Sequence, residues 1–284
     1  MPVTLLCPVR GCGAPLTREA HAFRCPRGHS FDVARSGYCN LLQPQDRKSK
    51  HPGDPKEAVL ARRRFLEAGH GGFLRTALLE AFDARPLPSR PAVLDVGCGE
   101  GFFLGSLARE REIEGHGIDL SLPAIDLAAR RWPGLSWFVV NADRALPYAD
   151  ASFDLALSLT ARRNAPELQR VLKPAGRLLV AIPGEDDLIE LREAVLGEGV
   201  RRDRIPAVSA ELAGFFELET HRPIRQQSRL DASSLRDLLA STYRGARRSE
   251  RERTESLESL EVTSSLDLLS YKAKPRFLRE PGFG

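Results

Sequence analysis

Three cysteines and a histidine near the start of the sequence have the residue types and spacing of a metal site. Four residues separate Cys7 from Cys12, twelve separate Cys12 from Cys25, and His29 follows Cys25 after three more. Structural zinc is held tetrahedrally by four thiolate or imidazole ligands, which such sequences supply as two close pairs. These four side chains fill that shell and leave no position for a catalytic water. We therefore expect a structural zinc site, the alternative being a chance cluster of cysteines.

A glycine-rich turn in the middle of the chain has the form of a nucleotide-binding loop. The stretch VLDVGCGEGFFL, residues 93–104, passes from an apolar strand pattern through Gly97, Gly99 and Gly101 into a helical one. Glycines let the backbone turn sharply here and approach a ligand closely. A second strand pattern, HGID, ends at Asp119, whose carboxylate can accept hydrogen bonds from both ribose hydroxyls of a nucleoside.

The elements that must position this turn alternate between strand and helix patterns. PAIDLAARRW is followed by LSWFVVNAD, by LPYADASFDLALSL, and then by APELQRVLKPAG and RLLVAIP. Short crossovers of this kind are typical of a parallel α/β sheet. The acidic residue after the second strand and LKPAG before a later strand make it look like the class I S-adenosylmethionine-dependent methyltransferase fold, an α/β, Rossmann-like fold with a seven-stranded, mostly parallel sheet. A doubly wound domain without a cofactor is the alternative.

Three regions are predicted along the chain: a zinc ribbon over residues 1–38, a basic linker over 39–58, and the methyltransferase domain over 59–284. The linker is rich in proline, arginine and lysine. After it, helical spacings interrupted at Gly69, Gly71 and Gly72 predict two helices with a break between them. The stretch LESLEVTSSLDLLSYKAK predicts late strands, and STYRGARRSERER predicts either an RNA-facing helix or a solvated charged surface.

The charge of the chain is uneven. Residues 1–90 carry 15 Lys and Arg against 8 Asp and Glu, although the whole chain is nearly balanced, at 42 against 38. A basic front third suits an acidic partner such as nucleic acid, but proteins that bind nothing anionic often carry such a segment. No apolar stretch approaches the roughly 20 residues of a membrane span, so we expect a cytoplasmic protein with no membrane partner. Its five cysteines are expected to be reduced.

With both halves of the chain considered, the sequence resembles the RlmA-type (RrmA) 23S rRNA guanine-N1 methyltransferases, including the branch that confers resistance to the macrolide tylosin. The resemblance covers most of the chain. It is carried by the order and spacing of CP-x3-C and CP-x2-H, FDVARSGYCNLL, HPGD, ARRRFLEAGH, VLDVGCGEGFFL, GIDLSLPAI, RNAPEL and VLKPAG.

The resemblance implies methyl transfer from S-adenosylmethionine to N1 of a guanine in a hairpin loop of 23S rRNA. It also implies that the ribbon helps to hold the RNA, that the protein is a homodimer, and that antibiotic resistance is a possible consequence. Cofactor binding is then expected from Gly71, Asp95, Gly97, Gly99, Glu100, Gly101, Asp119, Asn141, Ala142 and Asp187.

Guanine N1 must lose its proton before it becomes a good nucleophile, so an acceptor should lie near the attacking atom. The sequence does not identify this general base, and Asp187, Glu100 and Asn164 are the candidates. A target base taken out of its stack also needs a flat pocket, for which Tyr148 and Phe103 are available.

Three positions depart from the family pattern. Gly71 stands where relatives usually carry an aromatic residue, Asp187 where they have a histidine, and Arg162 where they have a proline beside the methyl-transfer site. These departures leave two alternatives open. One is a methyltransferase that acts on a different RNA or a small molecule. The other is a zinc-ribbon RNA-binding or assembly factor whose cofactor site has decayed.

Overall fold

The computed structural model describes residues 3–47, 52–84, 86–197, 199–242 and 257–275. All but the first two residues of STYRGARRSERER lie outside these ranges, so the prediction for that segment has no structural counterpart here.

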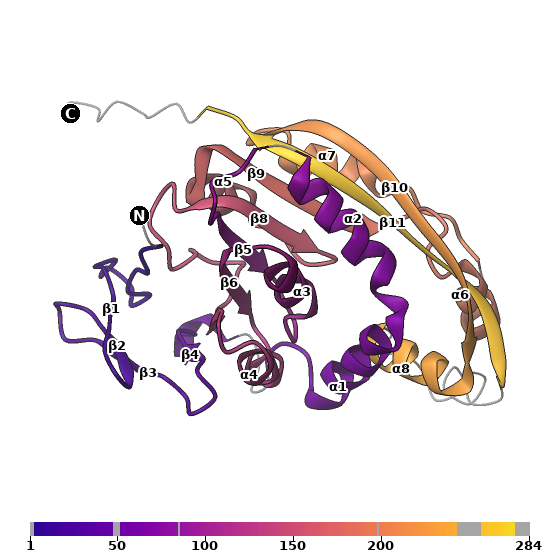
Figure 1. Cartoon of the computed structure of the whole chain (residues 1–284), viewed down its shortest axis with the longest axis horizontal. Coiled ribbons are helices and arrows are strands. Elements are labelled where there is room, and N and C mark those ends of the chain that lie inside the picture. Colours follow the sequence, from indigo (N-terminus) through magenta and orange to yellow (C-terminus); the bar gives the residue numbers. More distant parts are fainter. Residues whose placement is uncertain (1–2, 48–51, 85, 198, 243–256, 276–284) are drawn as a thin grey trace.

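An eight-stranded sheet forms the centre of the molecule (Figure 1). Its spatial order is β10 (Phe216–Asp231), β11 (Ser259–Ala273), β9 (Leu172–Pro183), β8 (Phe153–Leu159), β5 (Ala92–Val96), β6 (Glu114–Asp119), β7 (Ser136–Val139) and β4 (Cys39–Asn40). The strands from β9 to β4 are parallel, and β11 and β10 are antiparallel additions. The class I fold is confirmed, with β4 as one strand more than the predicted seven. Strand β4 is part of the sheet because its two residues, Cys39 and Asn40, pair with β7. These are the first residues of the predicted linker.

The direction of strand succession reverses at β5. Strands β6 and β7 lie on one side of β5, and β8 and β9 on the other. In parallel α/β sheets, ligands bind outside the carboxyl ends of the strands at such a switch point. Every residue of β5 is buried, because both faces of this central strand are covered.

Two different layers cover the sheet. Helices α2 (Gly72–Asp83), α3 (Phe102–Glu110) and α4 (Leu122–Arg131) pack on one face. Helices α5 (Ala165–Val171) and α7 (Ile205–Leu212) pack on the other, together with apolar residues of the N-terminal region. Helices α6 (Ile189–Leu196) and α8 (Ala232–Thr242) form a third apolar cluster with Phe65 at the end of α1 (Lys56–Phe65). The predicted helix break is confirmed, because a turn over η2 (Leu66–His70) separates α1 from α2, with Gly69 at a φ of 99°.

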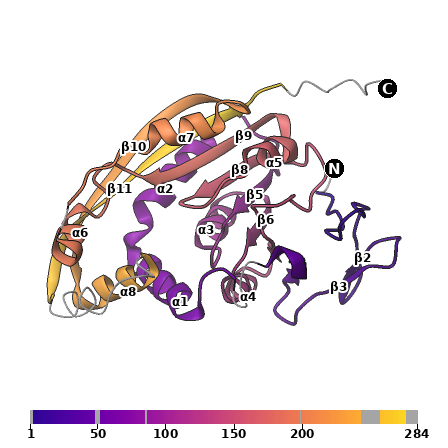
Figure 2. The ribbon, with the colours of Figure 1, turned by 180° about the vertical axis from the view of Figure 1, so that it is seen from behind.

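The ribbon shares its core with the sheet. Its strands β1 (Thr17–Arg18), β2 (Ala22–Arg24) and β3 (Ser30–Asp32) form a small antiparallel sheet at the β4 end of the molecule (Figure 2). The Phe23 ring packs edge-on against Phe138 of β7, with ring centroids 5.8 Å apart. In the loop after β7, Tyr148 is completely buried in the same cluster. The expectation that Tyr148 could form a base pocket is therefore wrong, since its ring lies inside the core among other aromatic rings.

Candidate cofactor cleft and zinc site

A cleft of about 560 Å³ opens at the carboxyl ends of β5, β6 and β8. Residues of α1, η2, α2 and α8 line the side of the cleft away from the sheet. Five of the ten predicted cofactor residues line it: Gly71, Gly97, Gly99, Asp119 and Asp187. The fold therefore gathers residues more than one hundred positions apart around one space.

Asp119 is held in place by the glycine turn. Its Oδ2 accepts a hydrogen bond from the Gly99 N–H at 2.9 Å, and its Oδ1 accepts one from the Ser121 N–H at 2.7 Å. Burial raises the pKa of Asp119, and the two backbone donors oppose that rise by favouring the carboxylate. The carboxylate thus has a fixed orientation beside the cleft, as a ribose contact requires.

The glycine turn is shaped by close approaches. A Cβ on Gly97, at a φ of +74°, would lie 2.5 Å from Cβ of Ala161. A Cβ on Gly101, at a φ of +75°, would lie 2.4 Å from Cη2 of Trp137. Gly101 therefore packs against an aromatic ring and does not line the cleft, whereas Gly97 keeps the turn close to the loop after β8. Both are positions where a side chain would be strained and obstructed.

Two buried carboxylates lie behind the cleft. Asp95 and Glu100 are each 2% exposed, and Oδ1 of Asp95 and both oxygens of Glu100 have no hydrogen-bond partner in the described part of the chain. Burial raises the pKa of Asp95 to about 7, against the opposing charge of Arg62. Buried carboxylate oxygens without a protein partner can accept hydrogen bonds from a bound ligand or balance its positive charge. A cofactor that carries a sulfonium and an ammonium group fits these surroundings.

Arg62 is a cleft residue that the sequence did not distinguish from its neighbours. The sequence shows three consecutive arginines in α1, of which Arg63 pairs with Glu67 and Arg64 with Asp237. The Arg62 guanidinium instead lines the cleft, with Nε 3.6 Å from Oε2 of Glu100. That Nε is buried without a hydrogen-bond partner among the described residues. Consecutive residues of a helix point in different directions, which separates the three arginines. This could be used only once the structure showed which side of α1 faces the cleft.

Asp187 lies across the cleft from the glycine turn, in the segment between β9 and α6. Its Oδ1 accepts a hydrogen bond from the Ser265 N–H at 2.9 Å, and burial raises its pKa to about 6. The next residue, Leu188, also lines the cleft and has a φ of 54°, and so does Thr160 after β8, at 55°. Strained backbone of this kind concentrates at functional sites.

The remaining predicted site residues lie outside the cleft. The Asn141 side chain donates to the Asp46 carbonyl at 2.9 Å and accepts from the Asp143 N–H at 3.0 Å. The Asn164 side chain donates to the carbonyl of Arg144 at 3.0 Å and more weakly to that of Ala142. These contacts order the loop after β7. An adenine contact by Asn141 and Ala142 stays a prediction, as does a catalytic role for Asn164.

Besides Asp187, two positions depart from the family pattern, and they have different structural settings. A Cβ on Gly71 would lie 2.8 Å from Cδ2 of Leu66 and 3.0 Å from the Phe102 ring, so the aromatic residue of relatives would require both neighbours to move. Arg162 stands at the mouth of the cleft, 81% exposed and paired with Asp143 at 3.3 Å.

The four predicted metal ligands converge. The Sγ atoms of Cys7, Cys12 and Cys25 and a ring nitrogen of His29 all lie within 4.8 Å of one another. Nδ1 of His29 is 3.4 Å from both Cys7 Sγ and Cys25 Sγ. Three thiols and an imidazole at these separations suit a tetrahedral zinc ion with no open position.

Comparison with known proteins agrees with both parts of this arrangement. A model described as "RlmA, N-terminal" matches residues 5–50, and one described as "Methyltransferase domain" matches residues 93–181. A 23S rRNA (guanine(748)-N(1))-methyltransferase from Streptomyces fradiae is 37% identical over 238 residues, or 83% of each chain. The chain belongs to the RlmA-type 23S rRNA guanine-N1 methyltransferase family.

Two further relatives support the assignment to the RlmA type. Proteins from Micromonospora griseorubida and Bacillus subtilis, both named as 23S rRNA guanine-N1 methyltransferases, are 36% and 34% identical over 81% and 76% of this chain. A Haloferax volcanii methyltransferase, solved with the Trm112 activator, shares the fold at a TM-score of 0.51 and 21% identity, covering 78% of this chain and 99% of that one. The RlmA-type chain is therefore an S-adenosylmethionine-dependent methyltransferase with a Cys3His zinc ribbon. None of its described helices is long and apolar enough to cross a membrane.

Proposed function

We propose that this protein transfers a methyl group from S-adenosylmethionine to N1 of a guanine in a hairpin loop of 23S rRNA. The observation that carries the proposal is the match to 23S rRNA guanine-N1 methyltransferases over more than three quarters of the chain. The ordered Asp119 and the glycine turn support it, because a decayed cofactor site has no need of them.

The reaction makes one N–C bond and releases one proton. S-adenosylmethionine supplies an electrophilic methyl group on a sulfonium. Guanine N1 would attack that carbon with an electron pair while the methyl–sulfur bond breaks, its electrons staying on the sulfur of the departing S-adenosylhomocysteine, and the N1 proton must pass to an acceptor. Of the three candidates, Asp187 lines the cleft, whereas Glu100 is buried behind it and Asn164 lies beside the loop after β7. We assign Asp187 as the acceptor, acting directly or through one water.

Positioning of the base is assigned to the apolar part of the cleft. Phe65, Phe73 and Phe103 are its aromatic lining residues. The partly exposed Phe65 and Phe73 can contact a guanine that has left its stack, while Phe103 is buried behind them. The exposed Arg162 at the mouth can meet the adjoining phosphate. In-line attack depends mainly on such positioning.

The test compares 23S rRNA from a deletion strain with 23S rRNA from the same strain after complementation, by reverse transcription. N1 methylation blocks Watson–Crick pairing, so the complemented strain should give a reverse-transcription stop that the deletion strain lacks. The base that corresponds to guanine 748, named for the S. fradiae relative, is the first to examine. Identical stops throughout both RNAs would overturn the proposal. Calorimetry with S-adenosylmethionine is the companion measurement, and no binding at millimolar ligand would exclude any methyltransferase function.

The remaining expectations depend on this substrate. Because ribosomal RNA is the proposed substrate, we predict that the enzyme is cytoplasmic. The homodimer and antibiotic resistance also stay predictions, and sedimentation and macrolide susceptibility of the deletion strain test them.

A further inference from the structure

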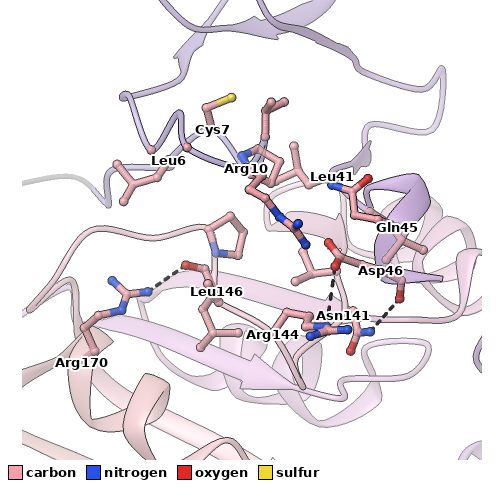
Figure 3. A pocket seen from close by; sticks show the side chains of 18 residues that line it. Leu6, Cys7, Arg10, Leu41, Gln45, Asp46, Asn141, Arg144, Leu146 and Arg170 are labelled. Carbon is pink, nitrogen blue, oxygen red and sulfur yellow. Dashed lines mark hydrogen bonds and ion pairs between the residues drawn. The ribbon is translucent and has the colours of Figure 1, made fainter. Parts of the chain in front are cut away.

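A groove separates the zinc ribbon from the methyltransferase domain on the side of the loop after β7. It encloses about 400 Å³, within the roughly 300–1,000 Å³ usual for small-ligand sites. The first zinc knuckle, at Cys7 to Gly11, forms one wall, and the loop at residues 141–147 forms the opposite wall (Figure 3). We call this space the ribbon groove.

Both walls of the ribbon groove are tied down. The Leu6 N–H donates to the Pro147 carbonyl at 2.9 Å, which joins the knuckle to the loop. From behind, Arg170 donates to the Leu146 carbonyl at 2.8 Å and the Tyr148 carbonyl at 2.6 Å. Glu167 accepts from the Leu146 N–H at 2.7 Å. The groove is therefore built before any ligand arrives, which lowers the entropic cost of binding.

The edge of the groove away from the zinc ligands carries positive charge. Its charged lining residues are Arg10, Arg144, Arg170 and Asp46. The acidic partners Glu167 and Asp150 already neutralise Arg170. Arg144 lies 3.6 Å from Asp46 and is 58% exposed, and the exposed Arg10 reaches from the ribbon toward the same carboxylate (Figure 3). Away from the Cys7 thiolate of the zinc site, two arginines facing one carboxylate leave a local positive charge to which a phosphate can bind.

The rest of the lining is mostly apolar. The partly exposed Leu6 and the buried Val140, Leu146 and Pro147 form the apolar floor of the groove. A combination of apolar surface with a cationic edge matches a nucleotide whose base is unstacked and whose phosphate is exposed. A membrane surface or an acidic peptide would contact the arginines but would leave the recessed apolar floor uncontacted.

We infer that the ribbon groove binds one unpaired nucleotide of the RNA, separate from the guanine that enters the cofactor cleft. The inference rests on the proposed function, since it takes the partner to be RNA. One loop connects the two sites: Arg144 lines the groove, and Asp143 beside it pairs with Arg162 at the mouth of the cleft. A strand that places a base in each site would be fixed at two points, and this gives the ribbon a role in selecting the target.

The test compares two double variants with equal changes of charge. Arg10→Glu with Arg144→Glu alters the groove. Arg35→Glu with Arg236→Glu alters two exposed arginines outside both sites. Binding of zinc-loaded protein to a full-length 23S rRNA transcript is measured over a range of salt concentrations. Loss of one phosphate contact lowers the magnitude of the slope of log K against log salt by about 0.7 to 1. We expect the groove variant to show this reduction, and about ten-fold weaker RNA binding, relative to the control variant.

Crosslinking gives a second readout. With 4-thiouridine in the transcript, the wild type should crosslink within residues 6–10 or 140–147. Zinc content and S-adenosylmethionine affinity should be unchanged in both variants, which shows that they fold. Equal affinity and slope in the two variants would overturn the inference while leaving the proposed function intact. A wild type that neither binds nor methylates 23S rRNA would instead remove the proposed function, and the inference with it.

Discussion

Among single residues, Arg62 has the clearest consequence for cofactor binding. Its guanidinium lines the cleft beside the buried Glu100. We expect this cation to bind the carboxylate at the amino-acid end of S-adenosylmethionine. We predict that Arg62→Met weakens binding of S-adenosylmethionine by roughly ten-fold or more, the value of one charge-assisted hydrogen bond. Binding of decarboxylated S-adenosylmethionine, which lacks the carboxylate, should change much less. Calorimetry with both ligands measures the difference.

The matched control for Arg62 is Arg63→Met. Arg63 lies on the same helix but pairs with Glu67 outside the cleft, so this variant should bind both ligands as the wild type does. If Arg62→Met weakens both ligands equally, then Arg62 acts by neutralising Glu100 and does not contact the cofactor carboxylate.

If Asp187 accepts the proton, the reaction rate should fall at acid pH and give an acid limb in the pH–rate profile. A proton acceptor must be ionised, and burial raises the pKa of Asp187 to about 6. The active fraction therefore falls as the pH drops through about 6, and the single-turnover rate should decline ten-fold per pH unit below it. Asp187→Asn should lower the rate at pH 8 by roughly 10²- to 10⁴-fold and remove this limb. The role fails if the limb persists in the variant, or if the rate at pH 8 is unchanged.

Among the elements, the zinc ribbon gives the clearest test of RNA binding, because its metal can be removed without deleting the apolar residues that cover the sheet. Cys25 is one of four converging ligands and does not line the cofactor cleft. We predict that Cys25→Ser releases zinc and weakens RNA binding at least ten-fold, while affinity for S-adenosylmethionine changes by less than about three-fold. Metal analysis, RNA filter binding and calorimetry make the comparison. RNA affinity that survives the loss of zinc would show that the ribbon does not hold the RNA.

Local patterns predicted the elements better than their packing. The alternation of strand and helix, the glycine turn and the two knuckles were evident because each is specified by residues near in sequence. The position of Arg62 and the burial of Tyr148 were not, because both depend on contacts with distant segments: α1 against the glycine turn, and the ribbon against β7. Strand β4 escaped prediction because two residues carry no periodicity.

For the whole molecule, the main observation is that ribbon and sheet share one apolar core. The connection from β7 to β8 contains no helix, and the ribbon covers the sheet face on that side. Leu5, Cys7 and Phe23 belong to the same cluster as Phe138 and Phe153. The ribbon, predicted as a separate region over residues 1–38, therefore shields part of the central core.

This shared core predicts that the methyltransferase domain is not stable alone. Deletion of residues 1–38 would expose Phe138 and the other apolar residues that the ribbon covers, so the fragment 39–284 should aggregate or unfold at a clearly lower temperature.

Phe23→Ala tests the same contact without truncation and should cost about 3–5 kcal/mol of unfolding free energy, as for other buried aromatic residues. The half-buried Phe31 provides the matched control, because Phe31→Ala removes a ring at the edge of the cluster and should cost distinctly less. Urea unfolding of the zinc-loaded proteins measures both. A fragment that melts at the temperature of the full chain, with Phe23→Ala no worse than Phe31→Ala, would show that ribbon and sheet fold independently.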